Sequence, residues 1–246
     1  MRQLSGELLL TALDYGAEDT YLGRIITMLA IAHPEISREQ IMTHSMQEIT
    51  VQLLALRALS FGPQMEGYLA CPGCNARLEF TLPIAPVIER LRQSTSLVKM
   101  LEVIGETGFT MRLATASDLL SIANITDLVD ARKQLLARCL SAPQDAKLSL
   151  DPFPALENPE FCQLAIETFD ALQSDAEINV ELLCAECGGS HSVDLDMGRF
   201  LWSEVRSAAM RLMGDVHELA SAYGWQESSI LAMGDIRRRA YLEMIQ

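Results

Sequence analysis

The first quarter of the chain carries apolar residues at the three- and four-residue spacing of amphipathic helices. This pattern runs from Ser5 to about Leu69. It is interrupted at Pro34, which we expect to end a helix, and Ser37 stands where the next helix would need an N-cap. The last helix of this stretch closes near Gly62. The pattern predicts an all-helical N-terminal lobe over residues 1–69.

Strict alternation of apolar and polar residues replaces the helical spacing in two short regions, 70–84 and 178–198. The first region contains the run RLEFTLPI after a CPGC turn. The second contains INVELL before a CAEC turn and SHSVDL after it. We expect the two regions to meet as one small, discontinuous β-ribbon.

Between these regions, residues 85–177 return mainly to helical spacing. Helices are predicted for three segments: PVIERLRQST, DLVDARKQLLARCLS and EFCQLAIETFDALQSDAE. A strand, followed by a helix capped at Thr115 or Ser117, is predicted for GFTMRLATASDLLSIAN. The proline-rich SAPQDAKLSLDPFPALENPE predicts a loop. Cys139 lies on the apolar side of its helix, and Cys162 is expected to be a small buried hydrophobe. The region is predicted to form a mostly helical insert.

The final segment, 199–246, predicts a compact tail of three helices. A long amphipathic helix, DMGRFLWSEVRSAAMRLMGDVHELASAYG, ends at Tyr223 and Gly224, and two short helices follow in ESSILAMG and DIRRRAYLEMI. The pattern as a whole predicts a mainly α-helical protein with a small β-ribbon, an α+β fold.

Composition and charge narrow the classes of partner. The chain has 246 residues, of which 49% are hydrophobic and 21% charged, so it can bury a substantial core. No apolar run approaches the roughly 20 residues that cross a bilayer, and the N-terminus lacks a signal-peptide pattern. A net charge of −14 disfavours binding to phosphate backbones, which depends on Lys and Arg. We therefore expect a soluble protein that binds neither membrane nor nucleic acid.

Four of the six cysteines form two CxxC pairs, Cys71 with Cys74 and Cys184 with Cys187. Two such turns supply four thiolates, which is the complete tetrahedral ligand set of a structural zinc ion. With every position taken by sulfur, no site remains for water or substrate, so the expected cofactor is a structural Zn²⁺ without a catalytic role.

The residues after each pair strengthen the zinc interpretation. Asn75 and Gly188 are of the types that best tolerate the left-handed conformation of a tight turn. Two alternatives remain. The pairs could be unrelated, as a redox dithiol or as buried thiols, and His191 is close enough to Cys187 to be a rival ligand, although its neighbours predict the start of a strand.

Motifs of enzymes are missing from the sequence. The CPGC turn has no accompanying HxE of a zinc deaminase, and HELAS at His217 lacks the second histidine of a zinc protease. The sequence also contains no P-loop, no GxGxxG and no GxSxG motif. We expect a protein without enzymatic activity.

Four segments follow one another along the chain in a distinctive order: ALRALSFGP…CPGCNARLEF, FTMRLATASDLL, LLCAECGGSHSVDLDMGRFLWSEV and DVHELASAYGWQESSILAMGDIRRRAYLEMI. Taken in this order, they resemble the baseplate hub assembly chaperone family of contractile phages and phage-derived contractile injection systems. The resemblance covers most of the chain, and its most specific part is a YGW…E..IL….RR..YL pattern at the C-terminus. That pattern is carried by Tyr223, Gly224, Trp225, Glu227, Ile230, Leu231, Arg237, Arg238, Tyr241 and Leu242.

The resemblance implies a non-enzymatic assembly factor or structural subunit of a contractile-tail baseplate. Its partners would be hub, spike or tape-measure proteins, and it would act as a chaperone in the bacterial cytoplasm or stay in the finished particle. Two other classes stay open from the residues alone. One is a zinc-ribbon regulatory protein that binds a nucleic-acid-processing partner, and the other is a redox protein that uses the CxxC pairs.

The C-terminal tail holds the candidate partner-binding residues, Trp225, Arg237, Arg238 and Tyr241, because Trp, Tyr and Arg dominate binding hot spots. A structural alternative stands beside this hypothesis. The aromatic residues, together with Tyr223, could form a clasp over a small bundle, and the arginines could pair with nearby carboxylates or a helix dipole instead of an acidic patch on a partner.

Overall fold

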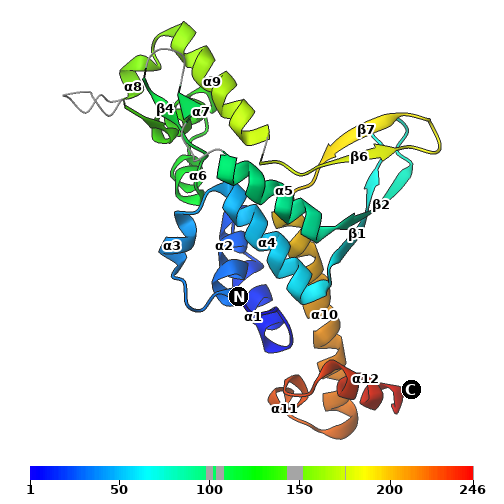
Figure 1. Ribbon diagram of the computed structural model, residues 1–246. Coiled ribbons are helices and arrows are strands. Elements are labelled where there is room, and N and C mark those ends of the chain that lie inside the picture. The colour runs from blue at the N-terminus through cyan, green and yellow to red at the C-terminus, as the bar shows by residue number, and fades with distance from the viewer. Residues whose placement is uncertain (98–101, 104–107, 143–151, 175, 246) are drawn as a thin grey trace.

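The computed structural model describes residues 1–97, 102–103, 108–142, 152–174 and 176–245. Within these ranges the protein is mainly α-helical with three small antiparallel sheets, which confirms the expected α+β class (Figure 1). No helix in the described part of the chain is long and apolar enough to span a membrane.

Four helices make up the N-terminal lobe: α1 (Glu7–Gly16), α2 (Tyr21–Ala32), α3 (Arg38–Met42) and α4 (Met46–Phe61). Serine side chains fix the starts of α3 and α4. The hydroxyls of Ser37 and Ser45 accept bonds from the backbone N–H groups of Gln40 and Glu48, whose side chains accept bonds from the serine N–H groups in return. The expected cap at Ser37 is confirmed.

The helical expectation is wrong for residues 64–69. The chain there forms β1 (Gln64–Ala70), which pairs with β2 (Arg77–Pro83). Gly62 has a φ of 102°, a value that side-chain-bearing residues rarely adopt, and Pro63 lacks the N–H that a helix would need. These two residues end α4, and the first strand begins at Gln64 instead of near residue 70.

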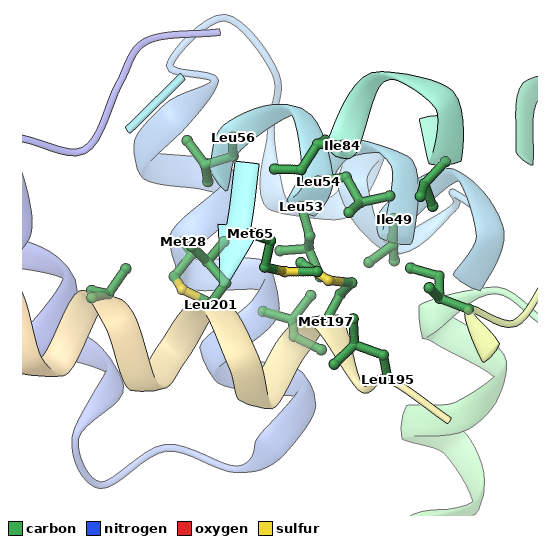
Figure 2. Close-up of a cluster of buried hydrophobic side chains, with 14 of the residues drawn as sticks. Met28, Ile49, Leu53, Leu54, Leu56, Met65, Ile84, Leu195, Met197 and Leu201 are labelled. Carbon is green, nitrogen blue, oxygen red and sulfur yellow. The ribbon is translucent and has the colours of Figure 1, made fainter. Parts of the chain in front are cut away.

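The main core lies between α2, α4, the first half of α10 (Met197–Tyr223) and the inner face of β1 (Figure 2). Met28 of α2, Leu53 of α4 and Leu201 of α10 are at most 2% exposed, and Met65 of β1 packs in the same cluster. Each fully buried side chain of this kind contributes about 1.5–3 kcal/mol. α5 (Ile84–Leu97) packs on α4 and adds Leu91, so the first helix after the ribbon belongs to this core.

One nearly buried ion pair ties the lobe to α10. Arg57 of α4 is 4% exposed, and its guanidinium donates to both carboxylate oxygens of Glu204, at 3.0 and 2.8 Å. The same guanidinium donates to the backbone carbonyls of Gly62 and Gln64, just before and at the start of β1. A single side chain thus fixes the relative positions of α4, α10 and the first hairpin.

The insert has a small core of its own. Its elements after α5 are β3 (Glu102–Val103), β4 (Thr110–Met111), α6 (Ala116–Ile122), α7 (Leu128–Cys139), β5 (Leu140–Ser141), α8 (Pro152–Ala155) and α9 (Pro159–Ser174). Met111, Leu136 and Cys139 are buried in a cluster separate from the main core. Cys139 is therefore on the buried side of α7 as expected, whereas Cys162 is half-buried at the edge of the same cluster.

Two details of the insert bear on the sequence predictions. Thr115 caps α6 in a capping box with Asp118, which confirms the first of the two expected caps. The loop predicted from SAPQDAKLSLDPFPALENPE is wrong at its end, because α8 starts at Pro152 and α9 at Pro159. Proline is favoured in the first turn of a helix, where its missing N–H costs nothing. Residues 143–151 of that segment lie outside the described part.

The C-terminal tail consists of the end of α10, α11 (Glu227–Leu231) and α12 (Asp235–Glu243), as predicted (Figure 1). α10 ends at Tyr223, and Gly224 adopts the left-handed conformation that terminates helices, with φ 66°. The buried positions of α10 continue past the main core through Leu212 and Leu219, and Ile230 of α11 is also fully buried.

Candidate metal centre

Two β-hairpins hold the four cysteines. β1 and β2 pair from Gln64↔Pro83 to Ala70↔Arg77, and the CPGC turn closes this end. β6 (Asn179–Leu183) and β7 (Ser190–Asp194) pair up to Leu183↔Ser190, and the CAEC turn closes that end. β2 contacts β6, so the hairpins lie side by side and bring their turns together (Figure 1).

The two cysteine turns have the same backbone geometry. In the first, Cys71 N–H donates to the Ala76 carbonyl at 2.8 Å, and Asn75 N–H donates to the Cys71 carbonyl at 2.8 Å. In the second, the corresponding bonds run from Cys184 to Gly189 and from Gly188 to Cys184, each at 2.9 Å. Asn75 and Gly188 have φ values of 62° and 70°, which confirms the left-handed conformation expected for both.

The four sulfur atoms form one cluster. The Sγ atoms of Cys71, Cys74, Cys184 and Cys187 all lie within 4.8 Å of one another. The contacts between hairpins are 3.7 Å for Cys71 with Cys187 and 3.6 Å for Cys74 with Cys184. A tetrahedral Zn²⁺ with Zn–S bonds of about 2.3 Å places its sulfurs about 3.8 Å apart, so the cluster fits zinc. The arrangement is a four-cysteine structural zinc site that joins two hairpins distant in the sequence.

Burial divides each pair in the same way. Cys71 and Cys184, the first cysteine of each turn, are 2% and 1% exposed and belong to the main core, whereas Cys74 and Cys187 are exposed. The site therefore lies at the edge of the core, with one cysteine of each turn inside and one outside. A metal ion there anchors the ribbon to the helical core as well as joining its two hairpins.

The crowding of four sulfurs favours a bound cation. The N–H groups of Cys187 and Glu186 lower the pKa of Cys184 to about 7. The N–H of Ala76 lowers the pKa of Cys74, but contacts with the neighbouring cysteine sulfurs, Cys184 first, outweigh it and raise that pKa to about 12. Without a metal, the surrounding protein groups thus favour a thiolate at Cys184 and a thiol at Cys74. A divalent cation would supply the positive charge that favours the thiolate form of all four cysteines.

His191 is the neighbour of this cluster rather than part of it. It lies on β7 opposite Leu182, which confirms the predicted strand, and its Nε2 is 3.3 Å from the Cys71 sulfur. The ring also lies close to the other turn, because a methyl group on Gly189 would come within 2.8 Å of Nε2. In the tautomer with a proton on Nε2, the imidazole would donate to the Cys71 sulfur and stabilise it from outside the ligand set.

The aromatic residues of the tail form a cluster at the C-terminal end of α10, whereas the zinc ribbon precedes the N-terminal end of this helix. Tyr223 and Trp225 stack with ring centroids 4.5 Å apart, and Tyr241 meets the face of this pair edge-on, 4.9 Å from Trp225. The guanidinium of Arg237 lies 5.9 Å from the centre of the Tyr241 ring. Trp225 and Tyr241 are half-buried, so the structure places them in the predicted clasp.

Arg238 is inside the tail. It is 7% exposed, and its guanidinium contacts Asp215 of α10 at 3.1 Å and Asp235 at the start of α12 at 2.6 Å. This is the carboxylate pairing that the sequence left open as the structural alternative. Arg237 and Arg239 are exposed on the same helix.

Sequence reasoning missed the ion pairs that connect distant segments. Arg57 and Glu204 are 147 positions apart, and no local pattern marks either as a partner. The Arg112–Asp118 pair of the insert was also missed, although Asp118 at the third position after Thr115 is the signature of a capping box. Burial raises the pKa of Asp118, but hydrogen bonds from Arg112 and Thr115 have the larger, opposite effect. The pKa of Asp118 is therefore below its usual value.

Comparisons with known proteins add no relative. No protein-family model, curated protein or solved structure matches the chain.

Proposed function

We propose that the protein is a non-enzymatic assembly factor or structural subunit of a contractile-tail baseplate, and that a structural zinc site stabilises its fold. The zinc part of this proposal rests on the four-sulfur cluster, whose ligand set leaves no coordination position for water or substrate. Catalysis by this metal is therefore not expected. The described residues contain no second group of His, Cys, Asp and Glu side chains arranged to hold a metal.

The baseplate part rests on the C-terminal tail. The residues that carry the resemblance there make one folded unit. Tyr223 stacks on Trp225 and Tyr241 packs edge-on against them, Arg238 binds two carboxylates, and Ile230 is buried. The residues of the C-terminal pattern are thus the same residues whose contacts hold the tail in its fold. This observation supports the proposal, because residues that follow the pattern of the resemblance and also pack together are a more specific feature than a pair of zinc knuckles.

The proposed partners are hub, spike or tape-measure proteins, bound in the bacterial cytoplasm while the particle is assembled. An assembly factor would cover their apolar surface before the baseplate closes, since such surface aggregates when it is exposed. The tail offers apolar side chains for this purpose, because Ile236 and Met244 are 89% and 72% exposed.

Co-expression with the tail genes of the same phage or injection system tests the proposal. The tagged full-length protein should capture a hub, spike or tape-measure protein, and assembly of particles should fail without it. A chain truncated at Tyr223 should lose capture but keep one zinc per chain. If the full-length protein captures none of these components and particles form normally in its absence, the proposed function is wrong.

A further inference from the structure

A cavity of about 350 Å³ lies where the tail meets the N-terminal helices. Its walls come from the start of α1, the end of α4, the middle of α10 and α12. Leu4, Leu9 and Leu212 give it a floor of buried apolar side chains. The cavity is thus bounded on one side by the lobe and on the other by the tail that carries the resemblance.

More arginines than carboxylates line the cavity. Arg211, Arg238 and Arg239 line it together with Asp215 and Asp235. Arg238 already binds both carboxylates, at 3.1 and 2.6 Å. Arg211 and Arg239 are exposed, and neither has an ionic partner among the described residues. Two guanidinium groups therefore face the cavity without a compensating carboxylate.

The tail differs in charge from the rest of the protein. Residues 199–246 contain six arginines and six acidic residues, so the whole net charge of −14 belongs to residues 1–198. An acidic partner is repelled by most of the molecule and meets positive charge at this cavity. Long-range fields of this kind decide where and how fast a partner binds.

We propose that this cavity docks an acidic segment of the protein partner. An Asp or Glu carboxylate of that segment binds the guanidinium groups of Arg211 and Arg239, and a neighbouring apolar side chain packs on the floor formed by Leu4, Leu9 and Leu212. Guanidinium matches a carboxylate in charge and in geometry, and the apolar floor adds affinity that charge alone does not give. The inference rests on the proposed function, because it names the surface that holds the baseplate protein.

Charge reversal at the two free arginines tests the site. Arg211→Glu and Arg239→Glu are compared with Arg206→Glu, which makes the same change at an exposed position of α10 outside the cavity. The probe is the hub, spike or tape-measure protein captured by the wild-type chain, with the dissociation constant measured by calorimetry. We expect each cavity variant to bind about tenfold more weakly or worse, and Arg206→Glu to stay within about twofold.

Zinc content and melting temperature confirm that each variant is folded. If both cavity variants bind the captured protein as Arg206→Glu does, the docking site is wrong while the proposed function stands. If the wild-type chain captures no component, the proposed function itself fails. Binding of a 20-nucleotide single-stranded RNA that is lost in the cavity variants, with protein capture unchanged, would assign the site to phosphate and overturn the proposal.

Discussion

The zinc ribbon and the C-terminal tail both project from the main helical core, but different interactions hold them (Figure 1). The ribbon consists of two two-stranded hairpins, and hairpins of this size are marginal in water without further support. The four-cysteine metal site joins the two hairpins, and one face of them packs on the core through Met65, Leu78 and Leu182. The tail has short helices and is held by a cluster of three aromatic rings and a buried arginine. Metal ligation joins the two hairpins of the first region, whereas side-chain packing and an ion pair hold the second together.

This difference predicts that each region can be disrupted without the other, and loss of zinc should have the largest effect. In Cys184→Ser we expect the zinc content to fall from one ion per chain to nearly none. Because structural zinc binds with an apparent free energy of about 10–16 kcal/mol in small peptides, the ribbon should lose several kcal/mol of stability. Metal analysis gives the stoichiometry, and hydrogen exchange should show loss of protection in β1, β2, β6 and β7 but not in α12.

Cys162→Ser is the matched control, since this thiol is half-buried in the insert and far from the cluster. It should keep one zinc per chain. An unchanged zinc content in Cys184→Ser would remove the four-thiolate site.

The tail should respond most to Arg238. Replacing it with Met keeps the aliphatic volume but leaves Asp215 and Asp235 without their shared partner, which we expect to cost about 2 kcal/mol. Hydrogen exchange should speed up in α11 and α12, with zinc content unchanged. Arg206→Met, at an exposed position of α10, should have little effect. Equal exchange in the two variants would mean that the ion pair does not hold the tail.

The smallest expected effect concerns His191, which acts on the ribbon from outside the ligand set. His191→Ala should weaken zinc binding about tenfold, as loss of an outer hydrogen bond to a ligand usually does. Competition with a chromophoric chelator measures the affinity, and His217→Ala, at an exposed position of α10, is the control. The visible spectrum of the Co²⁺-substituted variant should keep its four-sulfur character. A change in that spectrum would mean that His191 is itself a ligand.

Local patterns predicted the features that depend on neighbouring residues. The cysteine spacing gave the four ligands, Asn75 and Gly188 gave the turn conformation, and Ser37 and Thr115 gave the helix starts. The turn conformations and helix caps rest on backbone geometry within a few positions of the residue concerned, and the repeated CxxC spacing marks two matching halves of one ligand set, so the sequence itself carries the signal.

Features that depend on tertiary contacts escaped the prediction. The helical lobe was predicted to extend to residue 69, whereas β1 starts at Gln64 and is held by its pairing with β2. The pairing of Arg57 with Glu204 and the contact of His191 with Cys71 join segments more than a hundred positions apart. Such contacts are set by the packing of the whole molecule. The periodicity and motifs of a single sequence carry no signal for them.

The spacing of the zinc ligands also sets an order of events during synthesis. Cys74 and Cys184 are 110 positions apart, so the first turn leaves the ribosome long before the second exists. At about 5–20 residues per second, the first pair of thiols waits roughly 5–20 s for the other half of its site. During that interval the nascent chain can fold its N-terminal helices and the separate core of the insert. The metal then locks a molecule whose larger parts are already in place.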